Sequence, residues 1–298
     1  MISIKGVNKK LGDKEVLKNI NLHIEKGSIF GLIGPNGAGK TTLIKCLTGI
    51  YKIDAGDIKV CSENVDDNID IKHHIGYVAD QNDFFSYFKV KDVIKFYGMT
   101  YKNFSIARYN ELNDKFKIPE NIMVRKLSKG MKMRLAIMLN LSIMPKVLVL
   151  DEPTNGLDPM AKRETINILL EEVAERETII FISSHNLSDL ERICDKVAIL
   201  FKGEIRYVNS VEEMKKTIKK IQVVFKDEAP ADLENWAEVM NIEKIGRVYN
   251  IVTKNYNDEF KQRLDNSGIS FREEIDMSLE DMFIYSIGGE SGYEEIFK

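Results

Sequence analysis

Features that would place this 298-residue chain within a membrane or outside the cell are missing from its sequence. No apolar run approaches the roughly 20 residues with which a helix crosses a bilayer. The first 16 residues also lack the apolar core of a signal peptide. We therefore expect a cytoplasmic chain, for which any role at a membrane requires a partner subunit.

The chain also has few cysteines and no large excess of either positive or negative charge. Cys46, Cys61 and Cys194 stand far apart, without the close spacing of zinc ligands, and are expected to be reduced, buried thiols. The 43 basic residues nearly balance the 46 acidic ones, which leaves a net charge of −3. This balance gives no reason to expect a nucleic-acid partner.

What the sequence does contain is an alternation of short apolar strands and helices over residues 1–214. The stretch 27–34 is apolar at consecutive positions, which is typical of a strand buried on both faces of a parallel sheet. The alternation predicts an α/β fold with a parallel core sheet and an antiparallel N-terminal subsheet. A helical subdomain inserted over about residues 82–145 interrupts it and ends before Pro145.

A second domain is predicted over residues 215–298, where the pattern changes to short strands and helices of an α+β module. Helices are expected near 233–240 and 258–265, and a ferredoxin-like arrangement is one candidate. Ser278 and Asp281 are spaced as a capping box before a final helix. Two roles stay open for this domain: it locks or regulates a dimer, or it is a passive stabilising cap.

Residues 34–41 carry the strongest single motif, Gly-Pro-Asn-Gly-Ala-Gly-Lys-Thr, which fits G-x-x-x-x-G-K-[ST] between a strand and a helix. Such a loop wraps phosphates with backbone N–H groups, and the helix that follows adds its positive end. Lys40 is expected to reach the β- and γ-phosphates, Thr41 to bind Mg²⁺ and Thr42 to hold the α-phosphate. The predicted nucleotide-binding residues of the loop are Asn36, Gly37, Gly39, Lys40, Thr41 and Thr42.

A second acidic motif follows the apolar strand at 147–150. Ligands of open α/β sheets bind at the carboxyl ends of the strands, where Asp151 and Glu152 are placed. Asp151 is expected to hold Mg²⁺, and Glu152 to polarise a water for attack on the γ-phosphate. The two motifs together predict a Mg²⁺-dependent ATPase.

Further segments resemble those of the ATP-binding cassette (ABC) ATPases over roughly residues 1–210. Leu127-Ser-Lys-Gly-Met131 is similar to the family's signature, Asn155-Gly-Leu-Asp158 to its D-loop, and His185 to its switch histidine. The resemblance implies that Ser128, Lys129 and Gly130 grip the ATP of a second copy in trans. It also implies a D-loop role for Asp158, and that His185 contacts the γ-phosphate and helps Glu152.

Three segments depart from the family pattern: the signature, the Q-loop and the adenine contact. Lys129 and Met131 replace the usual glycine and glutamine of the signature. At the Q-loop, Asp80 and Gln81 compete for the contact to Mg²⁺ and the attacking water, and we favour Gln81. Leu11 stands where an aromatic residue normally stacks on adenine, so Leu11 and Val16 are expected to supply apolar contacts instead.

The resemblance implies an ATP-binding subunit that drives a separate integral membrane permease from the cytoplasmic face of the membrane, as a homodimer or a pseudo-symmetric dimer. Residues 277–283 resemble the tail of drug and antibiotic exporter ATPases. An aromatic cluster after the Q-loop is either core packing or a groove for a permease helix; it comprises Phe84, Phe85, Tyr87, Phe88, Phe96 and Tyr97. An ABC protein acting on ribosomes or DNA is the alternative, although this chain has one cassette and no basic tail.

Overall fold

The computed structural model describes residues 1–82, 86–185 and 187–286. The chain divides into two compact units, Met1–Val208 and a second that begins at Asn209. The division precedes the predicted boundary at 214/215 because α8 (Val211–Thr217) packs against α10 (Leu279–Ser286) of the second unit. Within the described residues, we find no helix with the length and apolar character needed to span a membrane.

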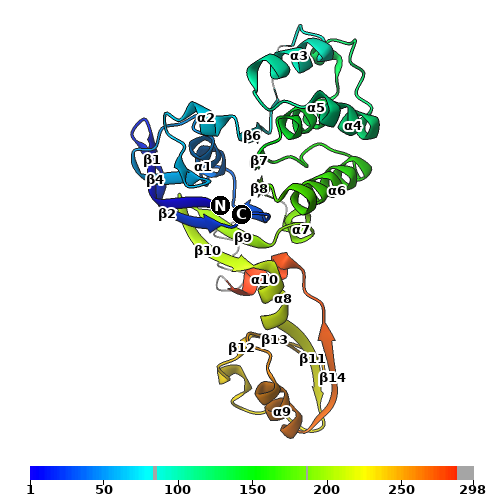
Figure 1. Ribbon diagram of the computed structural model, residues 1–298. Coiled ribbons are helices and arrows are strands. Elements are labelled where there is room, and N and C mark those ends of the chain that lie inside the picture. Colours follow the sequence, from blue (N-terminus) through cyan, green and yellow to red (C-terminus); the bar gives the residue numbers. More distant parts are fainter. Residues whose placement is uncertain (83–85, 186, 287–298) are drawn as a thin grey trace. The chain divides into compact units, whose positions relative to one another are not determined.

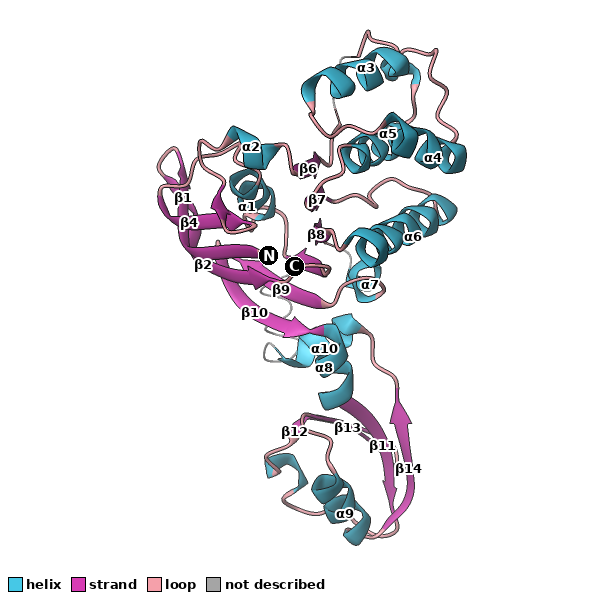
Figure 2. Cartoon of the chain, in the orientation of Figure 1, coloured by secondary structure: helices cyan, strands magenta, loops and turns pink. Residues whose placement is uncertain are grey.

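The first unit is built on a six-stranded sheet in the order β10-β9-β3-β8-β7-β6 (Figures 1 and 2). The pairs β3–β8, β3–β9, β7–β8 and β6–β7 are parallel, so the predicted parallel core is confirmed. Every residue of β3, β7 and β8 is buried, which explains their continuous apolar runs. The strands are β3 (Ile29–Ile33), β6 (Ile75–Val78), β7 (Val147–Asp151), β8 (Ile179–Ser184), β9 (Lys196–Phe201) and β10 (Glu204–Ser210).

A second sheet, in the order β2-β1-β4-β5, confirms the antiparallel N-terminal subsheet. Helix α1 (Lys40–Leu47) shares one apolar cluster with residues of both sheets. This common core fixes the start of α1, and with it the glycine loop, against the carboxyl end of β3. The remaining elements here are β1 (Ile2–Leu11), β2 (Lys14–Ile24), β4 (Ala55–Val60), β5 (Glu63–Asn64) and α2 (Ile69–Lys72).

The predicted helical insertion contains α3 (Val90–Thr100), α4 (Ile106–Phe116), η1 (Val124–Lys126) and α5 (Lys129–Ser142). Helix α5 ends shortly before Pro145, as the sequence predicts. The core then resumes with β7, α6 (Pro159–Arg176) and α7 (Leu187–Glu191). In Figure 1, α3, α4 and α5 gather at the upper right, on the side of the core sheet away from β1 and β2.

The second unit has a four-stranded antiparallel sheet in the order β12-β13-β11-β14. Its elements follow the β-α-β-β-α-β order of a ferredoxin-like domain, with the first helix reduced to the 3₁₀ turn η2. They are β11 (Lys219–Phe225), η2 (Leu233–Asn235), β12 (Val239–Ile245), β13 (Val248–Thr253), α9 (Asp258–Asn266) and β14 (Ile269–Ile275).

The helix predicted near 233–240 is therefore wrong. Leu233 and Trp236, three residues apart, are both buried in the apolar core of this unit, and the single 3₁₀ turn satisfies that spacing without a longer helix. The predicted helix near 258–265 is confirmed as α9. The capping box is confirmed too, because Asp281 N donates to Ser278 Oγ at 3.1 Å and Ser278 N donates to Asp281 Oδ2 at 3.3 Å.

Two ion pairs of contrasting burial join α4 to α6. Arg108 donates to Glu172 Oε2 at 2.8 Å, and the Glu172 side chain is 0% exposed. Lys115 reaches Glu171 Oε2 at 2.7 Å with both side chains partly exposed. The buried pair holds the helical insertion to the core, whereas the second pair is solvated.

We expect Arg108→Met to lower the free energy of unfolding by about 3 kcal/mol, because it leaves the Glu172 carboxylate buried without its main counter-charge. Lys115→Met, between the same two helices, is the matched control and should cost less than about 1 kcal/mol. Urea unfolding followed by circular dichroism measures both. Equal losses in the two variants would contradict the importance of burial.

Candidate active site

The glycine loop lies between β3 and α1 and lines a cavity of about 340 Å³. Gly37 and Gly39 have φ values of +80° and +112°, in the left-handed region that favours glycine. A Cβ at Gly34 would lie 2.2 Å from the carbonyl oxygen of Leu200, so no larger residue fits there. The cavity lining comprises Val16, Pro35, Asn36, Gly37, Gly39, Lys40, Thr41, Thr42, Asp80, Asp151 and Glu152.

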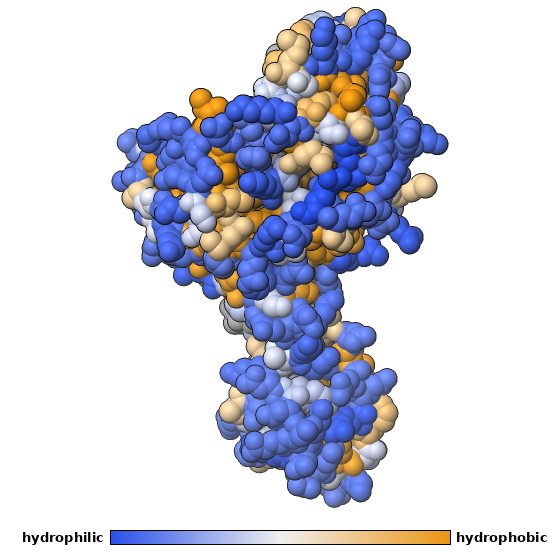
Figure 3. Space-filling view, viewed as in Figure 1, coloured by the Kyte–Doolittle hydropathy of each residue, from blue (hydrophilic) through white to orange (hydrophobic). Residues whose placement is uncertain are grey.

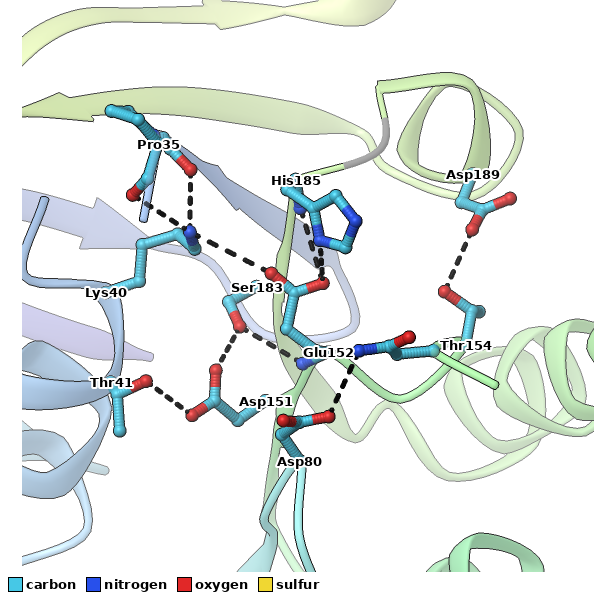
Figure 4. A network of polar contacts seen from close by, with 12 residues as sticks. Pro35, Lys40, Thr41, Asp80, Asp151, Glu152, Thr154, Ser183, His185 and Asp189 are labelled. Atoms are coloured by element: carbon cyan, nitrogen blue, oxygen red, sulfur yellow. Dashed lines mark hydrogen bonds and ion pairs between the residues drawn. The ribbon is translucent and has the colours of Figure 1, made fainter. Parts of the chain in front are cut away.

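Lys40 is the cation of this cavity and is 7% exposed. Its Nζ donates to the carbonyl oxygens of Gly34 at 2.6 Å and Pro35 at 3.3 Å, and it lies 3.8 Å from Glu152 Oε1 (Figure 4). Burial lowers the pKa of Lys40, and the charges of Glu152 and Asp151 oppose that shift. The Lys40 side chain is thus held inside the glycine loop by hydrogen bonds to two of its carbonyl oxygens.

Asp151 is 3% exposed and accepts hydrogen bonds on both carboxylate oxygens. Thr41 Oγ1 donates to Oδ2 at 2.8 Å, and Ser183 Oγ donates to Oδ1 at 2.5 Å (Figure 4). These two bonds join α1, β7 and β8 at one point. They also place a hydroxyl and a carboxylate oxygen side by side at the cavity, which are donor types that suit Mg²⁺.

Glu152 leaves the strand through a left-handed turn with a φ of +52°, a conformation that non-glycine residues rarely adopt. Its N–H donates to the Ser183 carbonyl oxygen at 3.1 Å. The carboxylate lies 2.7 Å from Nδ1 of His185, and the backbone N–H of His185 also donates to it, at 3.3 Å (Figure 4). The turn therefore aims Glu152 between Lys40 and His185.

At the Q-loop, the structure brings Asp80 to the cavity and not the favoured Gln81, which is exposed and absent from the lining. β6 ends at Val78, so Asp80 follows it closely at the carboxyl edge of the sheet. Asn155 Nδ2 donates to Asp80 Oδ1 at 3.3 Å, which ties this segment to the D-loop. The cavity lining of this chain therefore contains Asp80 and not Gln81.

Of the two residues expected to contact adenine, only one lines the cavity. Val16 lines the cavity, whereas Leu11 is 41% exposed and lies outside the lining. Leu11 is the last residue of β1, beside the turn into β2. The predicted apolar contact from Leu11 therefore has no support in this geometry.

The signature residues lie at the start of α5. Ser128 is the N-cap and accepts from Met131 N at 3.2 Å. A Cβ at Gly130 would lie 3.3 Å from Leu157 Cδ2, so this helix end packs on the D-loop. Asp158 caps α6 by accepting from Ala161 N at 2.9 Å. Ser128, Lys129, Gly130 and Asp158 do not line the cavity of their own chain.

Ser183 is the functional residue that the sequence reasoning missed. It stands opposite Asp151 in the parallel register of β7 and β8, which is why its hydroxyl reaches the Asp151 carboxylate. A signal was present in the sequence, because Ser183 is the second-last residue of a strand predicted to lie in the same sheet as the strand before Asp151. Pairing those two strands in register would have found it.

Comparisons with known proteins identify the family. Residues 17–155 match the family model described as ABC transporter. The chain is 32% identical over 289 residues to the ABC transporter ATP-binding protein YtrB of Bacillus subtilis (strain 168), a match that covers 97% of this chain and 99% of that protein. This chain belongs to the ABC transporter ATPases. It is an ATP-binding subunit of that family and an ATP-hydrolysing enzyme.

Other members of the family show the range of relatives. The bacitracin transport ATP-binding protein BcrA of Bacillus licheniformis is 31% identical over 305 residues, covering 97% of this chain and 98% of that protein. The methionine import ATP-binding protein MetN of Clostridioides difficile (strain 630) is 35% identical over 228 residues, covering 72% and 70%. A dimeric post-hydrolysis structure of the cassette MJ0796 with ADP and Pi shares the fold, with a TM-score of 0.65, 22% identity and coverage of 71% of this chain and 99% of that one.

We expect Ser183→Ala to lower ATP turnover about tenfold, because the buried Asp151 carboxylate loses one of its two charge-assisted hydrogen bonds. The affinity for ATP should change little, since Lys40 and the loop are untouched. Ser183→Thr keeps the hydroxyl and is expected to retain most of the turnover. Steady-state phosphate release measures all three chains; full activity in Ser183→Ala would remove Ser183 from the site.

Proposed function

We propose that this ABC transporter ATPase drives an exporter whose integral membrane permease is a separate polypeptide, and that it is peripheral on the cytoplasmic face of the cell membrane. The observation that supports this proposal best is the share of the chain over which each relative matches it. The matches to BcrA and YtrB cover 97% of the chain and so extend into the second unit, whereas the match to MetN covers 72%.

We also propose that the chain acts as a homodimer or a pseudo-symmetric dimer. The cavity offers Lys40 and the loop on one side, while Ser128, Lys129 and Gly130 lie outside it in the same chain. The N-terminal end of α5 is a second phosphate-binding helix end. A second copy presents this signature to the open side of the cavity, and its D-loop with Asp158 lies next to the signature.

Within that chamber, Asn36, Gly37 and Gly39 surround the phosphates with the loop backbone, and Thr42 faces the α-phosphate. Lys40 releases the carbonyl oxygens of Gly34 and Pro35 to bind the β- and γ-phosphates. Thr41 and Asp151, with Asp80 near them, would hold Mg²⁺, because their oxygens meet at the cavity. A Mg²⁺ ion held by these residues would supply positive charge against the negative charge that develops on the phosphates.

Glu152 acts as the general base. Its carboxylate is 13% exposed, faces the cavity and is oriented by His185. It accepts a proton from the attacking water while His185 fixes the direction of the carboxylate and reaches the γ-phosphate. The adenine ring is expected to rest on Val16.

The permease is proposed to dock on the helical insertion. Phe88, Phe96 and Met99 are exposed by 44%, 43% and 78%, and with Asp92 and Lys95 they line an open cavity of about 350 Å³. Figure 3 shows apolar residues at the surface of this region, at the top of the view. An amphipathic helix of a partner fits such a patch.

The rest of the aromatic cluster is divided between packing and surface. Tyr97 stacks on Tyr101 with ring centroids 5.4 Å apart, which is core packing. Tyr87 is 75% exposed with Arg125 over its ring at 5.0 Å. Phe84 and Phe85 lie outside the described residues.

Co-purification tests the docking surface. The chain is co-expressed with a candidate permease, an integral membrane protein from the same genome, and the complex is isolated through a tag on that protein. Met99→Glu is expected to reduce the recovered ATPase subunit about tenfold, because it buries an unpaired carboxylate in the interface. Ile69→Glu, the same change at a site 74% exposed on α2, is the control.

The direction of transport is read in inverted membrane vesicles from the same cells. In an inverted vesicle, an exporter pumps its substrate into the lumen when ATP is added outside. Labelled bacitracin, which the name of BcrA mentions, is the first substrate tested, followed by a panel of other cell-wall-active peptides. ATP-dependent accumulation that disappears in the Glu152→Gln chain supports export. Uptake that occurs only in right-side-out cells would contradict it.

A further inference from the structure

Two of the residues that depart from the family pattern lie next to each other in the structure. Asp80 occupies the Q-loop side of the cavity, and Lys129 occupies the third position of the signature, where glycine is usual. Lys129 Nζ lies 3.8 Å from Asp80 Oδ1 within one chain. Because glutamine and glycine carry no charge, this ion pair depends on both departures.

The charge of the cavity explains why Asp80 needs a cation. The lining carries the carboxylates of Asp80, Asp151 and Glu152 against the single ammonium of Lys40. ATP adds several negative charges to this site, and Glu152 already engages Lys40 at 3.8 Å and His185 at 2.7 Å. In the described part of the chain, Asp80 forms an ion pair with neither Lys40 nor His185. A counter-charge from outside the loop would therefore add to that of a Mg²⁺ ion held by Thr41 and Asp151.

Lys129 is held where it gives that compensation. A Cβ built on Gly156 would lie 3.1 Å from Lys129 Cδ, so the aliphatic stem of the lysine lies over the D-loop. Asn155, the preceding residue, donates to the same Asp80 oxygen at 3.3 Å. Asp80 thus accepts from the D-loop and pairs with the signature of its own chain.

We infer that Lys129 is the counter-ion of Asp80 in its own chain, and that it lowers the electrostatic cost of binding ATP in the cavity of that chain. This inference rests on the proposed function for its consequence. In the proposed dimer, each Lys129 also lies at the signature that faces the phosphates of the other chamber, so each of the two lysines is shared between two chambers. Binding of ATP in one cavity then competes with closure of the other for Lys129.

A double-mutant cycle in the Glu152→Gln chain tests the inference. MgATP binding is measured by fluorescence at a protein concentration at which sedimentation shows a single chain. Lys129→Met keeps the stem over Gly156 but removes the charge, and is expected to weaken the affinity about two- to fivefold, the range of partly exposed ion pairs. In the Asp80→Asn chain the same substitution is expected to have almost no effect.

Lys132→Met is the matched control, because it removes a lysine three residues along α5 that no hydrogen bond or ion pair of the described residues joins to Asp80. Lys129→Arg keeps the positive charge, so its affinity for MgATP should equal that of the chain with Lys129. An equal loss with Asp80 intact and in the Asp80→Asn chain, or no loss in either, would overturn the inference. ATP-dependent dimerisation is measured separately at high protein concentration. If no chain dimerises, the proposed dimer is contradicted. The double-mutant cycle on the monomer still decides whether Lys129 is the counter-ion of Asp80.

Discussion

The carboxylate of Asp151 connects the parts of this molecule that must act together. It is buried at the end of β7, and it accepts from Thr41 on α1 and from Ser183 on β8. A buried carboxylate without partners would be strongly destabilising, so the three segments are constrained to meet there. The glycine loop, the turn at Glu152 and the approach of His185 all take their positions from this meeting point.

The same constraint explains why the site is one-sided. Everything that surrounds Asp151 comes from the carboxyl edge of the core sheet, whereas the capped start of α5 lies outside the cavity of its own chain. In the proposed dimer, the phosphates are therefore bound by groups that lie on two different surfaces of one polypeptide. A second copy resolves this separation by bringing the α5 surface of one chain to the cavity of the other, which is why hydrolysis and association are linked in our account.

Patterns carried by backbone requirements were predictable from the sequence. Gly37 and Gly39 need positive φ, β3 and residues 147–150 of β7 form continuous apolar runs, and Ser278 caps its helix. Contacts that depend on which strands adjoin were not predictable in the same way: Ser183 has a role only because β8 pairs with β7. Asp80 lines the cavity and Gln81 does not, because a one-residue shift after β6 decides which side chain faces it. The helix predicted near 233–240 is replaced by a 3₁₀ turn because Leu233 and Trp236, three residues apart, are both buried.

The dependence of ATP turnover on protein concentration tests the central claim most directly, namely that one chain holds half of each chamber. We expect the rate per molecule to rise with concentration and to reach a plateau where sedimentation shows that the dimer is complete. A rate per molecule that stays constant while the chain remains monomeric throughout would contradict the account.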